Sequence, residues 1–178
     1  MAPRTISLIA FRNSPSQRAH FAIFVPSASN AEFGTLIHVI GAPMAGYQLE
    51  FKRGYNLATT HQLYTQVSIG GIDSQHISDL PANLSAGIAI KDSIPKCSME
   101  VAATQVLPPR ISENFLAPVN DTTNRRCQEW TMDYVRRLVS LGYIDQSAIQ
   151  IVQSERDPPT HGVGLNPAGA GRGRGRGQ

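Results

Sequence analysis

The residue best suited to chemistry in this sequence is Cys127, which lies in the run Asn124–Trp130 (NRRCQEW) where a helix should begin. A thiol in the first helical turn meets the positive end of the helix dipole and unpaired backbone N–H groups, and both favour the thiolate. Arg125 and Arg126, directly before it, act in the same direction. We therefore expect a reactive thiol with a pKa below the roughly 8.5 of a free cysteine.

A thiol nucleophile also needs a proton acceptor, and His20 is the candidate. It opens the strand-like run His20–Val25 (HFAIFV), and His38 lies inside the next such run, 35–40 (TLIHVI). Adjacent strands lie about 4.8 Å apart, so two imidazoles on one face of a hairpin can hydrogen-bond. The pattern predicts Cys127 as the nucleophile, His20 as the base and His38 as the group that orients His20. The Cys127 N–H would supply one oxyanion donor, and the sequence does not identify a second.

The elements that must position these residues are antiparallel strands followed by helices. Apolar or alternating runs predict about five strands, at residues 5–11, 20–25, 35–40, 46–55 and 62–69. The region 72–120 is harder to assign, because Ser85–Ile90 fits either a strand or a helix. Within the same region, Ser98–Val106 fits a short helix.

The clearest helix follows Cys127. Trp130, Tyr134 and Leu138 recur at helical spacing, which predicts an amphipathic helix with both aromatic residues in the core. The chain offers Asn124 or Thr123 to cap its start.

Beyond this helix, Gly142 provides a left-handed stop. Asp145 can cap a second helix that runs to about Glu155. Strands first and helices later predict a single α+β domain over residues 1–160. The Gly-rich segment 161–178 is predicted to be a disordered tail.

The charge of the chain is concentrated in that tail. The sequence has 16 basic and 13 acidic residues, and three of the arginines are Arg172, Arg174 and Arg176 in the Gly-Arg tract. Without them the remaining 13 basic residues balance the 13 acidic ones. The basic pI is therefore a property of the tail, which is a candidate for weak contact with RNA.

Other compositional features narrow the class of protein. No apolar stretch approaches the roughly 20 residues that a membrane span needs, and no secretory signal pattern is visible. The two cysteines do not make a disulfide framework. No close group of His, Cys or carboxylate residues has the spacing of a metal site, and no cofactor motif is present. We expect a monomer in the cytoplasm or nucleus, not a secreted protein.

The histidine and cysteine runs together resemble the circularly permuted papain-like superfamily of thiol hydrolases, which includes the lecithin:retinol acyltransferase-like and NlpC-type families. The likeness covers residues 18–40 and 124–142. It implies a papain-like fold in permuted order, with His20 as base, His38 as second histidine and Cys127 as nucleophile. Arg126 stands where the acyltransferases usually have an asparagine. The chain also resembles uncharacterised fungal proteins that share a Cys-Gln-x-Trp helix start.

Several functional interpretations remain open at this stage. The first is a hydrolase or acyltransferase that acts on an amide, peptide or ester bond of an unknown acyl or peptide substrate. The second is a catalytically inactive binding domain of the same fold, in which the three residues only pack. The third is an RNA-associated protein that works through its Gly-Arg tail. A disulfide between Cys97 and Cys127 would remove the nucleophile, and the sequence does not decide whether it forms.

Overall fold

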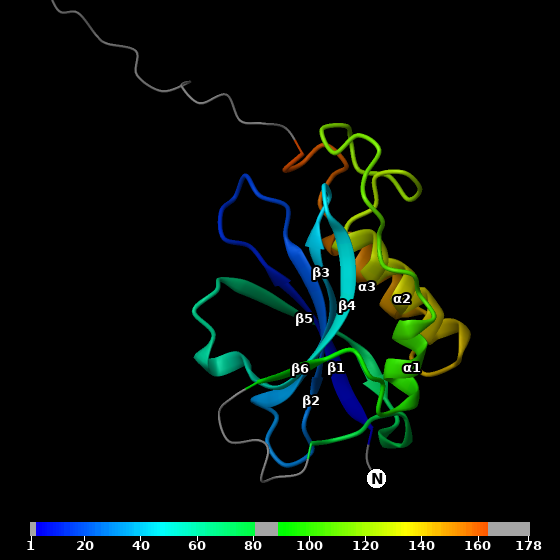
Figure 1. Cartoon of the computed structure of the whole chain (residues 1–178). Coiled ribbons are helices and arrows are strands. Elements are labelled where there is room, and N and C mark those ends of the chain that lie inside the picture. Colours follow the sequence, from blue (N-terminus) through cyan, green and yellow to red (C-terminus); the bar gives the residue numbers. More distant parts are fainter. Residues whose placement is uncertain (1–2, 81–88, 164–178) are drawn as a thin grey trace, which may run out of the picture.

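One antiparallel sheet and a layer of helices on one of its faces make up the protein (Figure 1). The computed structural model describes residues 3–80 and 89–163, and within them it contains six strands and three α-helices. The strands are β1 (Arg4–Phe11), β2 (His20–Pro26), β3 (Phe33–Ala42), β4 (Gly46–Asn56), β5 (Tyr64–Ile72) and β6 (Ile90–Asp92). The helices are α1 (Ser98–Thr104), α2 (Cys127–Ser140) and α3 (Ser147–Glu155).

The sheet order is β5-β1-β2-β3-β4-β6, so β2 and β3 are central strands. This confirms the predicted α+β class and the five predicted strands. The sixth strand, β6, was not predicted as such because its three residues carry little pattern and gain their place by pairing with β4. Most of the ambiguous run Ser85–Ile90 lies outside the described residues, as does the tail from residue 164. Among the described helices, none is both long and apolar enough to cross a membrane.

The two faces of the sheet carry separate apolar clusters. Phe21 and Ile23 of β2 point to the helices and pack with the main core, whereas Ala22 and Phe24 belong to a smaller cluster on the other face. Strand side chains alternate between faces with a period of two, so this division follows from the sequence. His20 has the same parity as Ala22 and therefore belongs to the face opposite the helices.

Helix α2 is the main element that covers the sheet. Its Trp130 and Tyr134 are fully buried and stack at 5.3 Å between ring centroids, which confirms the predicted core. The Trp130 indole N–H donates to the Val106 carbonyl at 2.9 Å, and the Tyr134 hydroxyl donates to the Met99 carbonyl at 2.9 Å. Both rings are therefore buried without leaving a polar group unpaired.

The start of α2 differs from the prediction. Its N-cap residue is Arg126, not Asn124 or Thr123. The Asn124 amide instead donates to the Ala117 and Pro118 carbonyls and holds the preceding loop. A residue of the helix itself pairs the backbone N–H of the N-cap residue, because the Glu129 carboxylate accepts the Arg126 N–H at 3.0 Å.

The turn between α2 and α3 matches the prediction at Gly142, whereas the N-cap residue of α3 is Gln146 rather than the predicted Asp145. Gly142 has φ of +71°, the left-handed conformation expected of a helix stop. The Asp145 carboxylate accepts the Ser147 N–H at 2.8 Å at the start of α3. This turn sets the position of α3 and of the residues that follow it.

Replacing Gly142 with alanine should lower the free energy of unfolding by about 1 kcal/mol, because a Cβ strains the left-handed backbone. Nothing lies within 4 Å of the added Cβ, so steric clash does not contribute. Gly71→Ala is the matched control, since Gly71 has ordinary backbone angles and only ordinary contacts near its Cβ. Urea denaturation of both variants measures the difference, and equal stability of the two would contradict this account.

Candidate active site at the starts of β2 and α2

A hollow of about 410 Å³ lies where several elements begin or end. It is lined by His20 at the start of β2, Gly41 near the end of β3, Tyr47 at the start of β4, and Arg126 and Cys127 at the start of α2. The volume is within the range of small-molecule sites. Two of the three predicted site residues, His20 and Cys127, therefore share one hollow.

The third predicted residue, His38, contacts His20 directly. His20 Nε2 and His38 Nδ1 are 2.8 Å apart. The register of β2 and β3 pairs Ile23 with Ile37, which makes the two histidines diagonal neighbours on one face. The proximity that was expected from a hairpin is thus present.

Glu50 extends this pair into a chain of three residues. It lies directly opposite His38 in the β3–β4 ladder, and its Oε1 is 3.1 Å from His38 Nε2. Glu50 was not among the site residues predicted from the sequence. The sequence does contain a pattern that points to Glu50. It lies on the polar face of the strand that was predicted next to the strand of His38.

The protonation states of His20 and His38 follow from burial and hydrogen bonding. Burial lowers the pKa of His20 to about 4 and that of His38 to about 3, so both rings are neutral near pH 7. A carboxylate can only accept, which assigns the His38 proton to Nε2 and leaves His38 Nδ1 as an acceptor. His20 then donates from Nε2, and its Nδ1 carries a free lone pair. Glu50 and His38 thus hold His20 in the tautomer of a base.

Cys127 lies beside the backbone of His20 rather than its ring. The Cys127 thiol donates to the Ala19 carbonyl at 3.8 Å, and the Phe21 N–H donates to the sulfur. In the part of the chain that the structure describes, no hydrogen bond joins Cys127 to the His20 ring. The ring stacks on Phe11 of the smaller cluster, 6.2 Å between centroids, and so leaves β2 on the other face. Both side chains reach the hollow because it lies at the end of the sheet.

The pKa of Cys127 is raised to about 11, chiefly by burial of the thiol. This contradicts the expected value below that of a free cysteine. Arg125 is paired with Asp133 at 2.6 Å, and the Arg126 guanidinium donates to the Phe115 carbonyl at 2.8 Å, so among the described residues neither arginine forms a hydrogen bond to the sulfur. The helix N-terminus is occupied by Glu129, whose negative charge also raises the pKa of the thiol.

Glu129 forms hydrogen bonds and ion pairs with several of the segments around the hollow. Its carboxylate is buried and accepts from the Arg18 guanidinium at 3.0 Å and from Arg156 at 2.8 Å, besides the Arg126 N–H. Arg18 precedes β2, and Arg156 follows α3. One carboxylate therefore joins three segments that are distant in sequence.

Gln128 and Asp157 form a second set of hydrogen bonds between the same segments. Gln128 donates to the Ala19 carbonyl at 2.9 Å and to the Asp157 carboxylate at 2.8 Å. Asp157 also accepts the Ala19 N–H at 2.9 Å, so both backbone groups of Ala19 are held. The position of the residue before His20 is thereby set by α2 and by the segment after α3.

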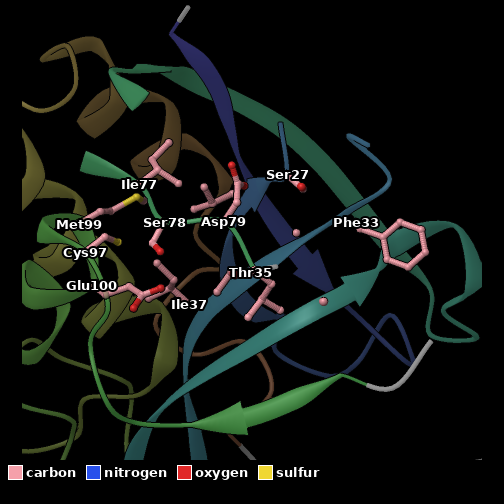
Figure 2. Close-up of a pocket in the computed structure, with 14 residues that line it drawn as sticks. Ser27, Phe33, Thr35, Ile37, Ile77, Ser78, Asp79, Cys97, Met99 and Glu100 are labelled. Carbon is pink, nitrogen blue, oxygen red and sulfur yellow. The ribbon is translucent and has the colours of Figure 1, made fainter. Parts of the chain in front are cut away.

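The other cysteine lies in a different environment (Figure 2). Cys97 lines a cavity of about 20 Å³ together with Met99 and Glu100 of α1 and Thr35 and Ile37 of β3. That volume holds about one water molecule, and burial raises the pKa of the Cys97 thiol. Both cysteines are free, so the disulfide left open by the sequence is absent.

These observations define an α+β protein with a Glu-His-His chain and a buried thiol at one hollow. The chain belongs to a family of unknown function, DUF6540, whose model matches residues 6–145. The matched segment includes His20, His38, Glu50 and Cys127. No curated protein and no solved structure matches the chain.

The raised pKa of Cys127 predicts slow alkylation at neutral pH. In a Cys97→Ser variant, the rate of reaction with iodoacetamide should rise about tenfold per pH unit from pH 7 to 10, because the thiolate fraction rises in that proportion below the pKa. The measurement is the second-order rate followed by intact-protein mass. A plateau reached by about pH 8.5 would show that the thiol is not shifted upward.

Glu129→Gln should reduce the free energy of unfolding by about 3 kcal/mol or more, because Arg18 and Arg156 would lose their buried anion. Asp121→Asn is the control. Asp121 also contacts Arg156, but its side chain is 67% exposed, so its loss should cost less than about 1 kcal/mol. Denaturant titration compares the two variants, and similar small losses would remove Glu129 from its central role.

Proposed function

We propose that this protein is a cysteine-dependent hydrolase or acyltransferase acting on an amide, peptide or ester bond. Cys127 is the nucleophile, His20 the base, and His38 with Glu50 orients His20. The observation that carries the proposal is the hydrogen-bonded chain from Glu50 to His20, which ends at the hollow lined by Cys127. The order of elements, two histidine-bearing strands before a cysteine-bearing helix, supports a permuted papain-like arrangement.

The proposed reaction starts from a neutral thiol and a neutral imidazole, not from a preformed ion pair. The thiol turns from the Ala19 carbonyl to His20 Nδ1, a change that substrate binding often brings to catalytic hydrogen bonds. Sγ attacks the carbonyl carbon as His20 takes the thiol proton. The tetrahedral intermediate expels the leaving group, which receives that proton from His20. Water or another acceptor then cleaves the thioester by the reverse proton route.

Charge that develops on His20 during this step is balanced through His38. When His20 takes up the proton, its Nε2–H strengthens its bond to His38 Nδ1, and the His38 Nε2–H strengthens its bond to Glu50. A carboxylate behind a histidine stabilises the imidazolium and keeps the required tautomer. Glu50 thus acts through His38 as a positioning residue.

Tyr47 is the best candidate for the second oxyanion donor. Its pKa is raised above the ordinary value, first by burial and next by its interaction with Cys127, so the hydroxyl keeps its proton near the proposed nucleophile. The hydroxyl has no hydrogen-bond partner among the described residues and lines the hollow. Together with the Cys127 N–H it would bind the oxyanion of the tetrahedral intermediate.

One observation favours the alternative, an inactive binding domain of the same fold. The resting thiol is buried, has a pKa near 11 and is bonded to backbone groups. In that case the hollow would bind a ligand without reaction.

The RNA contact predicted for the tail rests on Arg172, Arg174 and Arg176, which lie outside the described residues.

Acylation by p-nitrophenyl acetate tests the proposal. The intact mass should show one acetyl group on Cys127, and Cys127→Ala should abolish this product. His20→Ala should slow acylation by about 10²–10⁴-fold and Tyr47→Phe by about 10²-fold. The rate should fall as the pH drops through about 4, because protonated His20 cannot accept a proton.

Cys97→Ser and His61→Ala are the controls, since neither residue lines the hollow. Both should acylate at the rate of the unchanged protein. Acylation that is equally fast without His20, or that is absent from Cys127 altogether, would favour the binding domain instead.

A further inference from the structure

Arg126 is a buried arginine without an anionic partner. The residue as a whole is only 9% exposed. Among the described residues its guanidinium makes one hydrogen bond, from Nη2 to the Phe115 carbonyl at 2.8 Å, and its Nε is buried without a partner. Over residues 3–80 and 89–163 it forms no ion pair with a carboxylate.

Other buried arginines of the protein differ from it. Arg53, 1% exposed, is paired with both Glu100 and Asp92. Arg18 is paired with the Glu129 carboxylate. Burying a guanidinium without a counter-charge costs several kcal/mol, which proteins normally avoid by pairing. An arginine left unpaired at this cost points to a missing anion.

The position of Arg126 indicates where that anion would bind. The residue directly precedes Cys127 and lines the same hollow as Cys127 and His20. Glu129 lies nearby, but its oxygens already accept from Arg18, Arg156 and the Arg126 backbone. The hollow is therefore lined by two guanidinium groups, of which that of Arg18 is paired with Glu129 and that of Arg126 has no carboxylate partner among the described residues.

The charge and shape of this group favour a carboxylate. One guanidinium charge matches a monoanion, whereas phosphate sites usually combine several cationic groups. The planar guanidinium presents parallel N–H donors that fit the two oxygens of a carboxylate. The start of α2 adds the positive end of the helix dipole at the same place.

We propose that the hollow selects acyl substrates that bear a carboxylate, which the Arg126 guanidinium binds beside the carbonyl that Cys127 attacks. A monoamide or monoester of a dicarboxylic acid, or a peptide with a free carboxyl group near the scissile bond, has this chemistry. The inference rests on the proposed function for its substrate role, but carboxylate binding can be measured without catalysis.

The first experiment measures binding alone. Adipic acid monoamide, which has one carboxylate, should raise the melting temperature of the full chain, and neutral adipamide should not. Arg126→Met should lose the effect, while Arg125→Met should keep it, because Arg125 is paired with Asp133 and does not line the hollow. An equal shift in Arg126→Met, or an equal shift with inorganic phosphate, would overturn the proposal.

The second experiment measures turnover with two p-nitrophenyl esters of matched length, the adipate monoester and the neutral hexanoate. The carboxylate ester should be favoured at least tenfold in kcat/KM, as one charge-assisted hydrogen bond allows. Arg126→Met should remove the preference. Arg126→Lys, which keeps the charge but not the paired donors, should retain only part of it.

The outcomes separate the two proposals. Carboxylate binding without ester turnover would refute the hydrolase and leave the Arg126 site intact. Turnover without a preference would refute the Arg126 site and leave the hydrolase intact. Arg126→Met should be at least as stable as the unchanged protein, since it removes an unpaired buried charge, and its melting temperature checks this.

Discussion

The buried Glu129 carboxylate is the interaction on which the rest of this site depends. It accepts hydrogen bonds from the segment before β2, from the segment after α3 and from the backbone at the start of α2. Charge-assisted hydrogen bonds are directional, so the three segments have little freedom relative to one another. Gln128 and Asp157 extend the same junction to both backbone groups of Ala19. The relative position of His20 and Cys127 is a consequence of these contacts.

The same carboxylate also helps to keep the Cys127 thiol protonated. Glu129 occupies the helix N-terminus, where a dipole would otherwise favour a thiolate at Cys127, and its charge raises the pKa of the thiol. Burial acts in the same direction and more strongly. The contacts that assemble the site therefore oppose ionisation of the Cys127 thiol. A neutral thiol and a neutral imidazole that line one hollow suit the proposed mechanism, in which the proton moves during attack.

The geometry of the sheet adds a second constraint. The Glu50–His38–His20 chain lies on the face away from the helices, whereas Cys127 lies on the helix face. Such groups meet only where the sheet ends, and the hollow lies there. Arg126, the N-cap of α2, lines the same hollow. The end of the sheet thus gathers the proposed base, the proposed nucleophile and an unpaired cation from different elements.

The sequence by itself determined the order of the first five strands and of the helices, the burial of Trp130 and Tyr134, the stop at Gly142 and the closeness of His20 to His38. Each of these follows from local periodicity, backbone preference or the register of neighbouring strands. Only the tertiary structure decided that Glu50 completes the histidine chain, that Asn124 holds a loop instead of capping α2, and that Cys127 has a raised pKa. It also decided that Arg126 is buried without a counter-ion. Burial and charge pairing depend on groups brought together from distant parts of the chain, such as Arg18, Glu129 and Arg156. Local sequence patterns do not indicate which of these distant groups come into contact.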